Sequence, residues 1–260
     1  MKIGCCLSFK DEERIKLGKA LGLEFMETAL VSLSQANSEE IAQFAEFLHE
    51  IDFKCPAANL MFPGDMRLTG PEADFKKAED YLYRTFENVK KVGIKVIVFG
   101  SGGARRVPEG FSIEAATEQL VELCSDYISP VMEKYDVVCG IEELLKRSCN
   151  ILNNCKEAMD VVYKVNKPSI KLLADLFHIG MENEPVESLA DYKGYIAHVH
   201  ISSPKNNGAF PRDGDGEDYK LFFDMLRKTG YGEGLVSIEG NDGGNFEAAV
   251  VETLRCLKKI

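Results

Sequence analysis

The sequence of 260 residues contains no tryptophan, no Cys-x-x-Cys pair and no apolar run near the ~20 residues that a membrane-spanning helix needs. Its eight cysteines are scattered, and several lie inside apolar, strand-like segments, where cysteine behaves as a small hydrophobic residue. The first residues, Met1 to Gly4, do not open a long apolar stretch of the signal-peptide kind. These features predict a cytoplasmic protein with free thiols and no membrane association.

Positive charge is also scarce. The chain has 42 Asp and Glu against 31 Lys and Arg, which gives a formal net charge of −11 at pH 7. A protein that grips a phosphate backbone normally has a basic excess or a basic stripe. Here the basic residues form only short runs, such as the pairs Lys90-Lys91, Arg105-Arg106 and Lys258-Lys259. The sequence therefore predicts no nucleic-acid partner.

What the sequence does contain is a regular alternation of short β-branched apolar runs with longer segments of helical period. The expected strands are Lys2–Leu7, Phe25–Ala29, Cys55–Leu60, Val96–Phe99, Val137–Glu142, Ile170–Asp175, Ile196–Ile201 and Leu235–Glu239. The expected helices are Asp11–Ala20, Ser38–Ile51, Asp74–Val92, Ile113–Lys134, Asn154–Val165, Val186–Leu189, Tyr219–Lys228 and Phe246–Leu257.

Eight such units favour a parallel sheet, and eight is the number of strands that closes a barrel. A doubly wound sheet more often has fewer strands and a Gly-rich first turn, whereas the first turn here, Leu7 to Asp11, has no G-x-G-x-x-G pattern. No segment rich in Pro, Gly or Ser divides the chain. We therefore expect an α/β fold in which residues 1–260 form one (β/α)₈ TIM barrel domain.

Four consecutive expected strands end on a carboxylate or an imidazole, namely Glu142, Asp175, His200 and Glu239. Neighbouring strands of a parallel barrel lie less than about 5 Å apart, so these side chains can converge at the barrel mouth. Three of the four histidines fall in this region. His198 and His200 share a strand face, so only one of them can be at the mouth, and we expect His198 to be buried below it.

Three carboxylates and one imidazole form a hard, mostly oxygen ligand set. This set favours Mn²⁺, Mg²⁺ or Co²⁺, with Zn²⁺ also open. A structural zinc site would need thiolates at a spacing that the cysteines do not show. The sequence thus predicts a divalent-metal site at the four strand ends.

At these residues the chain resembles the sugar phosphate isomerase/epimerase family, the xylose isomerase-like TIM barrels, which includes ketose 3-epimerases, hydroxypyruvate isomerases and inosose dehydratases. The motifs that carry the resemblance, in chain order, are Ile141-Glu142, Asp175-Leu176-Phe177-His178, His198-Val199-His200 and Ser237-Ile238-Glu239-Gly240. The resemblance implies that Glu142, Asp175, His200 and Glu239 bind the metal. It also implies that Glu142 and Glu239 are the acid/base pair and that His178 binds substrate oxygen.

The chain departs from the ketose 3-epimerase pattern at several points, of which two concern candidate residues. Glu143 stands where those enzymes tend to have proline, and Arg212 is shifted from the position of their usual arginine. Arg212 therefore stays a substrate-binding candidate whose position in the loop differs from that of the family's usual arginine. Arg105, in a Gly-rich loop after the fourth strand, could hold a phosphate or carboxylate of the substrate or be a surface residue. Asn59, at the end of the third strand, is a further substrate-binding candidate.

The leading hypothesis is a metal-dependent isomerase or epimerase that transfers a proton next to the carbonyl of a small carbohydrate. A dehydratase or lyase of the same fold begins with the same step and stays open, as does a non-catalytic sugar-binding barrel. A nuclease of the endonuclease IV type is disfavoured because it needs more histidines and a basic groove. The sequence leaves open the substrate, its phosphorylation, the metal and the oligomeric state, a homo-oligomer included.

Overall fold

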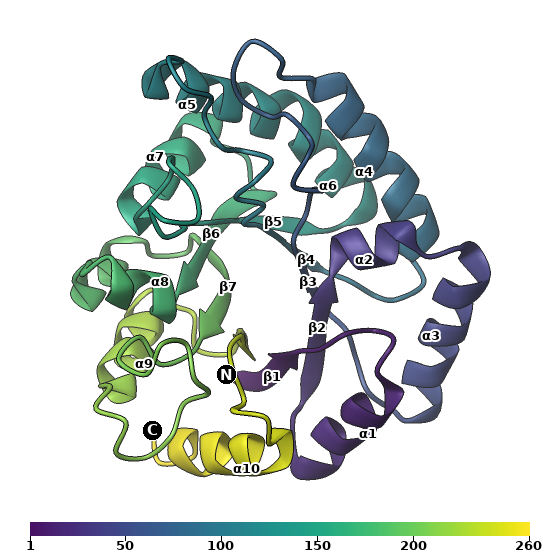
Figure 1. Ribbon diagram of the computed structural model, residues 1–260, viewed down its shortest axis with the longest axis vertical. Coiled ribbons are helices and arrows are strands. Elements are labelled where there is room, and N and C mark those ends of the chain that lie inside the picture. The colour runs from purple at the N-terminus through teal and green to yellow at the C-terminus, as the bar shows by residue number, and fades with distance from the viewer.

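The computed structural model describes residues 1–260, and its eight parallel strands close into a barrel in the order β1 to β8 (Figure 1). The strands are β1 Lys2–Cys6, β2 Phe25–Ala29, β3 Ala57–Asn59, β4 Val96–Phe99, β5 Val138–Glu142, β6 Ile170–Asp175, β7 Ile196–Ile201 and β8 Leu235–Ile238. Parallel pairing of β8 with β1 completes the ring. The (β/α)₈ TIM barrel predicted from the sequence is confirmed.

Helices form the outer layer around the strands (Figure 1). They are α1 Glu12–Leu21, α2 Leu30–Gln35, α3 Ser38–Glu50, α4 Phe75–Val89, α5 Ile113–Glu122, α6 Ser129–Tyr135, α7 Cys155–Val165, α8 Leu176–Met181, α9 Tyr219–Lys228 and α10 Phe246–Leu257, with a π-helical segment η1 Leu123–Ile128 and a 3₁₀ segment η2 Val186–Asp191. None of these helices combines the length and the apolar character that a membrane crossing requires.

Local sequence explains where the helices begin. The Asn37 side chain accepts hydrogen bonds from the N–H groups of Glu39 and Glu40, and the Glu40 side chain accepts one from the Asn37 N–H. This reciprocal arrangement satisfies N–H groups that the first turn of α3 would otherwise leave free. The helix then buries its apolar face, including Phe44 and Phe47, against the barrel.

The expected helix Ile113–Lys134 is present but is not uniform. It runs from α5 through the π-helical segment η1 into α6, whose second residue is Pro130. Proline has no N–H and its ring crowds the carbonyl four residues earlier, so a regular α-helical ladder cannot pass through this position. A π-helical segment just before the proline is one way for a continuous helix to accommodate that gap.

Two short helices that the sequence analysis did not predict follow strands directly. α2 begins after β2, and α8 begins at the residue after Asp175. The Asp175 side chain accepts hydrogen bonds from the N–H groups of Phe177 and His178, so the last residue of β6 is also the cap of α8. As a result α8 fixes His178 next to the end of the strand.

Candidate active site

A cavity of about 670 Å³ lies at the carboxyl-terminal ends of the strands. In barrels of this type the chemistry is located at this end. Its walls come from the loops after β3 to β8, and they include Leu60, Gly100, Ser101, Gly102, Gly103, Glu142, Leu144, Ser148, Asp175, Phe177, His178, Ser202, Asn207, Gly208, Glu239, Gly240 and Asn241.

Glu142, Asp175, His200 and Glu239 converge at the base of this cavity. Each offers one ligand atom, and these four atoms all lie within 4.8 Å of one another. His200 Nδ1 is 2.8 Å from Glu239 Oε2 and 3.3 Å from Glu142 Oε1. Strand pairing explains the convergence, because Asp175 is in register with His200 on the neighbouring strand. The four residues thus form a group that could hold a metal ion.

His200 is held from below by Glu27, which lies on β2. His200 Nε2 donates to Glu27 Oε1 over 3.0 Å, and both side chains are fully buried. The other carboxylate oxygen of Glu27 accepts from His198 Nε2 over 2.7 Å. A carboxylate on one ring nitrogen orients a metal-binding histidine and leaves the other nitrogen for the ion. Here Nδ1 faces the three carboxylates, so the geometry fits a divalent cation.

The buried charges of this group shift one another's pKa. Burial raises the pKa of Glu142 above its ordinary value, although His200 opposes the shift. Burial alone would also raise the pKa of Glu239, but the attraction of His200 lowers it overall. Burial alone would lower the pKa of His200, yet Glu239 and Glu27 raise it well above the ordinary value. The two glutamates are therefore chemically unequal.

His178 lies beside the group and lines the cavity. Its Nδ1 donates to the Glu143 carbonyl over 2.7 Å, which leaves Nε2 without a protein partner. The Glu143 side chain is buried beneath Asp175, and its Oε1 accepts from the Asp175 N–H over 2.9 Å. Glu143 thus faces away from the cavity and fixes the backbone of the residues that do line it.

Asn59 lies at the end of β3 and reaches across to β8. Its Nδ2 donates to Glu239 Oε1 over 2.8 Å and lies 3.6 Å from Cys6 Sγ. Cys6, Glu27 and His200 form a second group whose ligand atoms lie within 4.8 Å of one another. Sequence reasoning did not single out Cys6 and gave Glu27 no definite role. The available signal for Glu27 was a charged side chain inside a short strand that begins with Phe25 and Met26.

Two expected substrate-binding residues lie elsewhere. Arg105 is fully buried, and its guanidinium donates to the carbonyls of Phe99 and Glu142 over 2.8 and 2.5 Å. It therefore ties the end of β4 to the end of β5 and presents no donor to the cavity. Arg212 is exposed and lines a separate hollow of about 250 Å³ over the loop that follows β8. Neither residue lines the mouth cavity in this structure, so a role of Arg105 and Arg212 in substrate binding stays a prediction that this geometry does not support.

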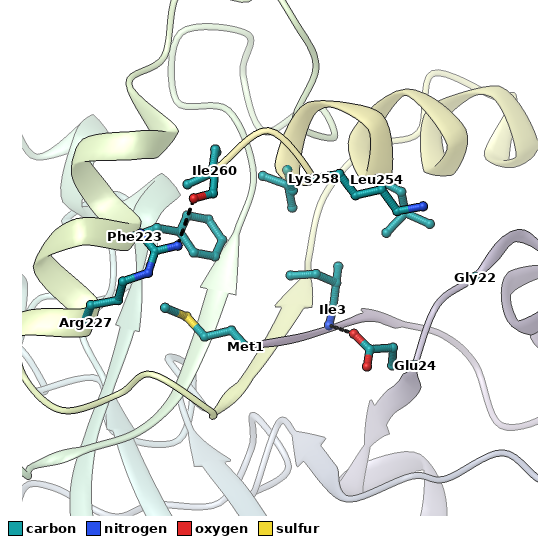
Figure 2. A pocket seen from close by; sticks show the side chains of 10 residues that line it. Met1, Ile3, Gly22, Glu24, Phe223, Arg227, Leu254, Lys258 and Ile260 are labelled. Carbon is teal, nitrogen blue, oxygen red and sulfur yellow. Dashed lines mark hydrogen bonds between the residues drawn. The ribbon is translucent and has the colours of Figure 1, made fainter.

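A second hollow, of about 410 Å³, lies at the opposite end of the barrel between β1, α9 and α10 (Figure 2). Two of its polar side chains are already paired. The Arg227 guanidinium donates to the Ile260 carbonyl over 3.1 Å, and Glu24 accepts from the Ile3 N–H over 3.1 Å. The remaining lining is largely apolar, with Phe223 among it. This hollow has no convergent acidic or basic groups, so the mouth cavity is the candidate active site.

Comparisons with known proteins agree with the fold. A D-psicose 3-epimerase from Enterocloster bolteae is 32% identical over 75 residues, which is 28% of this chain and 25% of that protein. A putative hydroxypyruvate isomerase from Xenopus laevis is 27% identical over 151 residues, 55% of this chain and 54% of that protein. The matched segments therefore span about a quarter to a half of the length of these curated relatives.

Solved structures align over much more of the chain. A D-allulose 3-epimerase from Methylomonas sp. matches with a TM-score of 0.85 at 17% identity, over 100% of this chain and 97% of that chain. Another structure of that enzyme is a complex with D-allulose. At this identity the likeness concerns the fold alone. A family model described as the xylose isomerase-like TIM barrel matches residues 15–260, and the chain belongs to that family.

Proposed function

We propose that the protein is a divalent-metal-dependent isomerase or epimerase that transfers a proton at the carbon next to the carbonyl of a small sugar or sugar derivative. The observation that carries this proposal is the convergence of Glu142, Asp175, His200 and Glu239 within 4.8 Å at the base of the mouth cavity. Membership of the xylose isomerase-like family supports it.

The four convergent residues would hold the ion. Their oxygen-rich set favours Mn²⁺, Mg²⁺ or Co²⁺, while Zn²⁺ also accepts carboxylate and imidazole ligands. A bound divalent ion supplies Lewis-acid stabilisation of the negative charge that develops on the substrate when a proton leaves the carbon beside a carbonyl. Glu27 keeps His200 in the ring orientation that this binding needs.

Glu142 and Glu239 are the proposed acid/base pair. They come from opposite sides of His200, on β5 and at the end of β8, so a substrate between them can meet one carboxylate on each face. The two carboxylates differ in their surroundings, since the pKa of Glu142 is raised by burial while His200 lowers that of Glu239. An epimerase uses both groups, and an aldose–ketose isomerase can shuttle the proton on one.

His178 is the proposed substrate-binding residue. Its Nε2 is free and the ring lines the cavity, and the carboxylates of Asp175 and Glu142 outweigh burial and raise its pKa. Through Nε2 the ring can exchange a hydrogen bond with a substrate oxygen, as a donor when the ring is protonated. Asn59 acts chiefly by holding Glu239, since its amide already donates to that carboxylate.

A dehydratase or lyase is the second candidate, and His178 is the observation that favours it. A protonated ring beside the two glutamates can give its proton to a departing hydroxyl group. Both reactions begin when a carboxylate removes the same proton. They differ in the product, which is an isomeric sugar in one case and a dehydrated compound in the other.

The proposal is tested by incubating the purified protein in D₂O with a panel of ketoses and keto acids. We expect deuterium to enter the carbon next to the carbonyl and an isomeric product to appear in the NMR spectrum. Loss of water would replace the isomerase by the dehydratase. An absence of both exchange and product across the panel would overturn the proposed function.

Metal content gives a separate test. We expect a divalent ion to co-purify or bind stoichiometrically, and Glu239→Gln to lose it, as measured by elemental analysis. Glu233→Gln is the matched control, because Glu233 is exposed on the loop before β8 and touches none of the four residues. Equal metal content in the two variants would remove Glu239 from the ligand set.

A further inference from the structure

Arg105 is among the largest side chains that the fold buries completely, and it follows the loop Gly100–Gly103 that lines the mouth cavity. The guanidinium has no carboxylate partner, and its Nε–H has no hydrogen-bond acceptor. A buried charge in such surroundings destabilises a fold unless it gains strong contacts in return. The contacts that hold this guanidinium are its hydrogen bonds to the carbonyls of Phe99 and Glu142.

These two bonds lie where the pairing between β4 and β5 ends. The last residue pair of the two strands is Phe99 with Ile141, so Glu142 lies one residue beyond the pairing on this side. Arg105 Nη1 donates to the Phe99 carbonyl over 2.8 Å, and Nη2 donates to the Glu142 carbonyl over 2.5 Å. One planar group thus joins the ends of both strands and fixes the main chain of Glu142 where pairing with β4 no longer does.

The same loop sets the space for the Glu142 side chain. The carboxylate packs against Gly100, since a Cβ at Gly100 would lie 2.1 Å from Glu142 Oε2. The Ser101 carbonyl accepts from the N–H groups of Ala104 and Arg105 over 3.0 and 3.2 Å, which turns the chain back toward the strand ends. Glu142 is therefore held at its carbonyl by Arg105 and confined at its carboxylate by Gly100. A shift of its main chain would displace the carboxylate from the metal group.

The main chain of Arg105 is itself anchored. Thr69 Oγ1 donates to the carbonyls of Arg105 and Arg106 over 3.3 and 2.9 Å. The neighbouring Leu68 N–H donates to the Ala104 carbonyl over 3.0 Å, and both Leu68 and Thr69 are buried. The guanidinium therefore extends from a fixed backbone, and it can hold the two strand ends in place.

Arginine suits this position because its planar guanidinium presents several N–H groups in a fixed fork, whereas a lysine ammonium is a single point of charge. The guanidinium carbon of Arg105 also lies 5.7 Å from the ring centroid of Phe99. A role confined to packing needs no charge here, since an apolar side chain of similar volume would avoid burying one. The charge is therefore explained by what it holds, the ends of β4 and β5.

We propose that Arg105 is a positioning residue for the reaction, which fixes the main chain of Glu142 and, through it, the carboxylate that serves as base and metal ligand. Arg105 acts without touching the substrate, since it is fully buried and does not line the mouth cavity. This inference rests on the proposed function, in which Glu142 has both roles. A change at Arg105 should therefore lower the rate of proton transfer and the metal affinity, while KM at saturating metal stays nearly the same.

The test compares R105A and R105K with R84A in the D₂O exchange assay at saturating Mn²⁺. Misplacement of a reacting group by about 1 Å can cost roughly 10²-fold in rate, so kcat of R105A should fall at least about tenfold, with KM within about twofold of the wild type. R105K keeps the charge but not the fork, so its kcat should lie between the two. R84A is the matched control, because Arg84 is an exposed arginine of α4 whose Nε donates to the Asp80 carbonyl.

Two further readouts separate positioning from a general loss of stability. Guanidinium chloride, added well below the concentration that unfolds the protein, should restore kcat of R105A saturably and should not raise kcat of the wild type or of R84A. A Mn²⁺ titration should show that R105A binds the ion about tenfold more weakly or worse, as is typical when a residue that orients a metal ligand is lost.

Unchanged kcat and Mn²⁺ affinity in R105A, a loss that appears in KM instead of kcat, or a loss that neither guanidinium nor R105K relieves would overturn the inference. If R105A does not fold, R105K is judged by the same split between kcat and KM, and a kcat equal to that of the wild type is then the contrary result. A wild type that binds Mn²⁺ but exchanges no proton would overturn the proposed function alone, because the Mn²⁺ titration still tests whether Arg105 positions Glu142.

Discussion

The charged side chains at the two ends of the barrel have different kinds of partner. At the floor, around the hollow of Figure 2, Arg227 pairs with Asp224 over 2.8 Å and donates to a backbone carbonyl, and Glu24 accepts from a backbone N–H. At the mouth, the ion pairs of Glu142, Asp175 and Glu239 are only with histidines. No lysine or arginine lies within ion-pair distance of these carboxylates.

This difference indicates what each end is for. Gathering carboxylates in a buried place without a strong cation destabilises a fold, because each charge loses water and repels the next. The charged groups at the floor are paired and carry little of this cost, whereas the buried carboxylates at the mouth carry it. A divalent ion bound by Glu142, Asp175, His200 and Glu239 would offset the repulsion, which is why we assign the chemistry to the mouth alone.

Exchanging one carboxylate for an amide at each end gives the largest expected contrast. Glu142→Gln removes both a metal ligand and the proposed base, so solvent proton exchange should fall by roughly 10²–10⁴-fold or more. Glu24→Gln, which lies beside the floor hollow, should leave the exchange rate unchanged. Rates are measured by NMR in D₂O on the panel compound that exchanges fastest.

The two variants must also be compared by thermal unfolding, since Glu24 accepts from the Ile3 N–H and its loss alone can lower stability. Retained exchange in Glu142→Gln would remove this residue from the base role. A similar loss of exchange in both variants would show that Glu24 also affects the reaction. The contrast between the two ends would then be wrong.

An intermediate effect is expected one layer below the mouth. Glu27→Gln keeps the size of the side chain but can no longer accept from both His198 and His200, so Nδ1 of His200 loses its fixed orientation. Loss of such a supporting carboxylate typically weakens metal affinity about 10–100-fold. The measurement is a metal titration of the folded variant, and a dissociation constant equal to that of the wild type would show that Glu27 has only a packing role.

The sequence predicted the barrel and the convergence well, because both follow from repeated local patterns. Alternating strand and helix periods predict a parallel sheet, and a polar residue at the end of a buried strand stands out against its apolar neighbours. Glu142, Asp175, His200 and Glu239 could be singled out on that basis. His198, two residues before His200 on the same strand face, was correctly placed in the buried layer.

What the sequence could not supply was the direction in which a long side chain turns. Arg105 lies in a Gly-rich loop that suggests a flexible surface segment, yet its guanidinium is buried against two strand-end carbonyls. Glu27 depends in the same way on partners 171 and 173 residues away. Such contacts arise only when the barrel closes, so no local pattern carries them. The brief helix α8 escaped prediction because six residues are too few to show a helical period.

The smallest effect is expected at the floor, where Arg227→Gln removes an exposed ion pair with Asp224 and a hydrogen bond to the Ile260 carbonyl. Exposed pairs of this kind contribute about 0–1 kcal/mol, so the melting temperature should fall by no more than roughly 2–4 °C. Proton exchange should stay at the wild-type rate, because the changed group lies at the far end of the barrel from Glu142. Calorimetry and the D₂O assay on the same sample check both points. A variant that kept its melting temperature but lost exchange would contradict the assignment of the chemistry to the mouth alone.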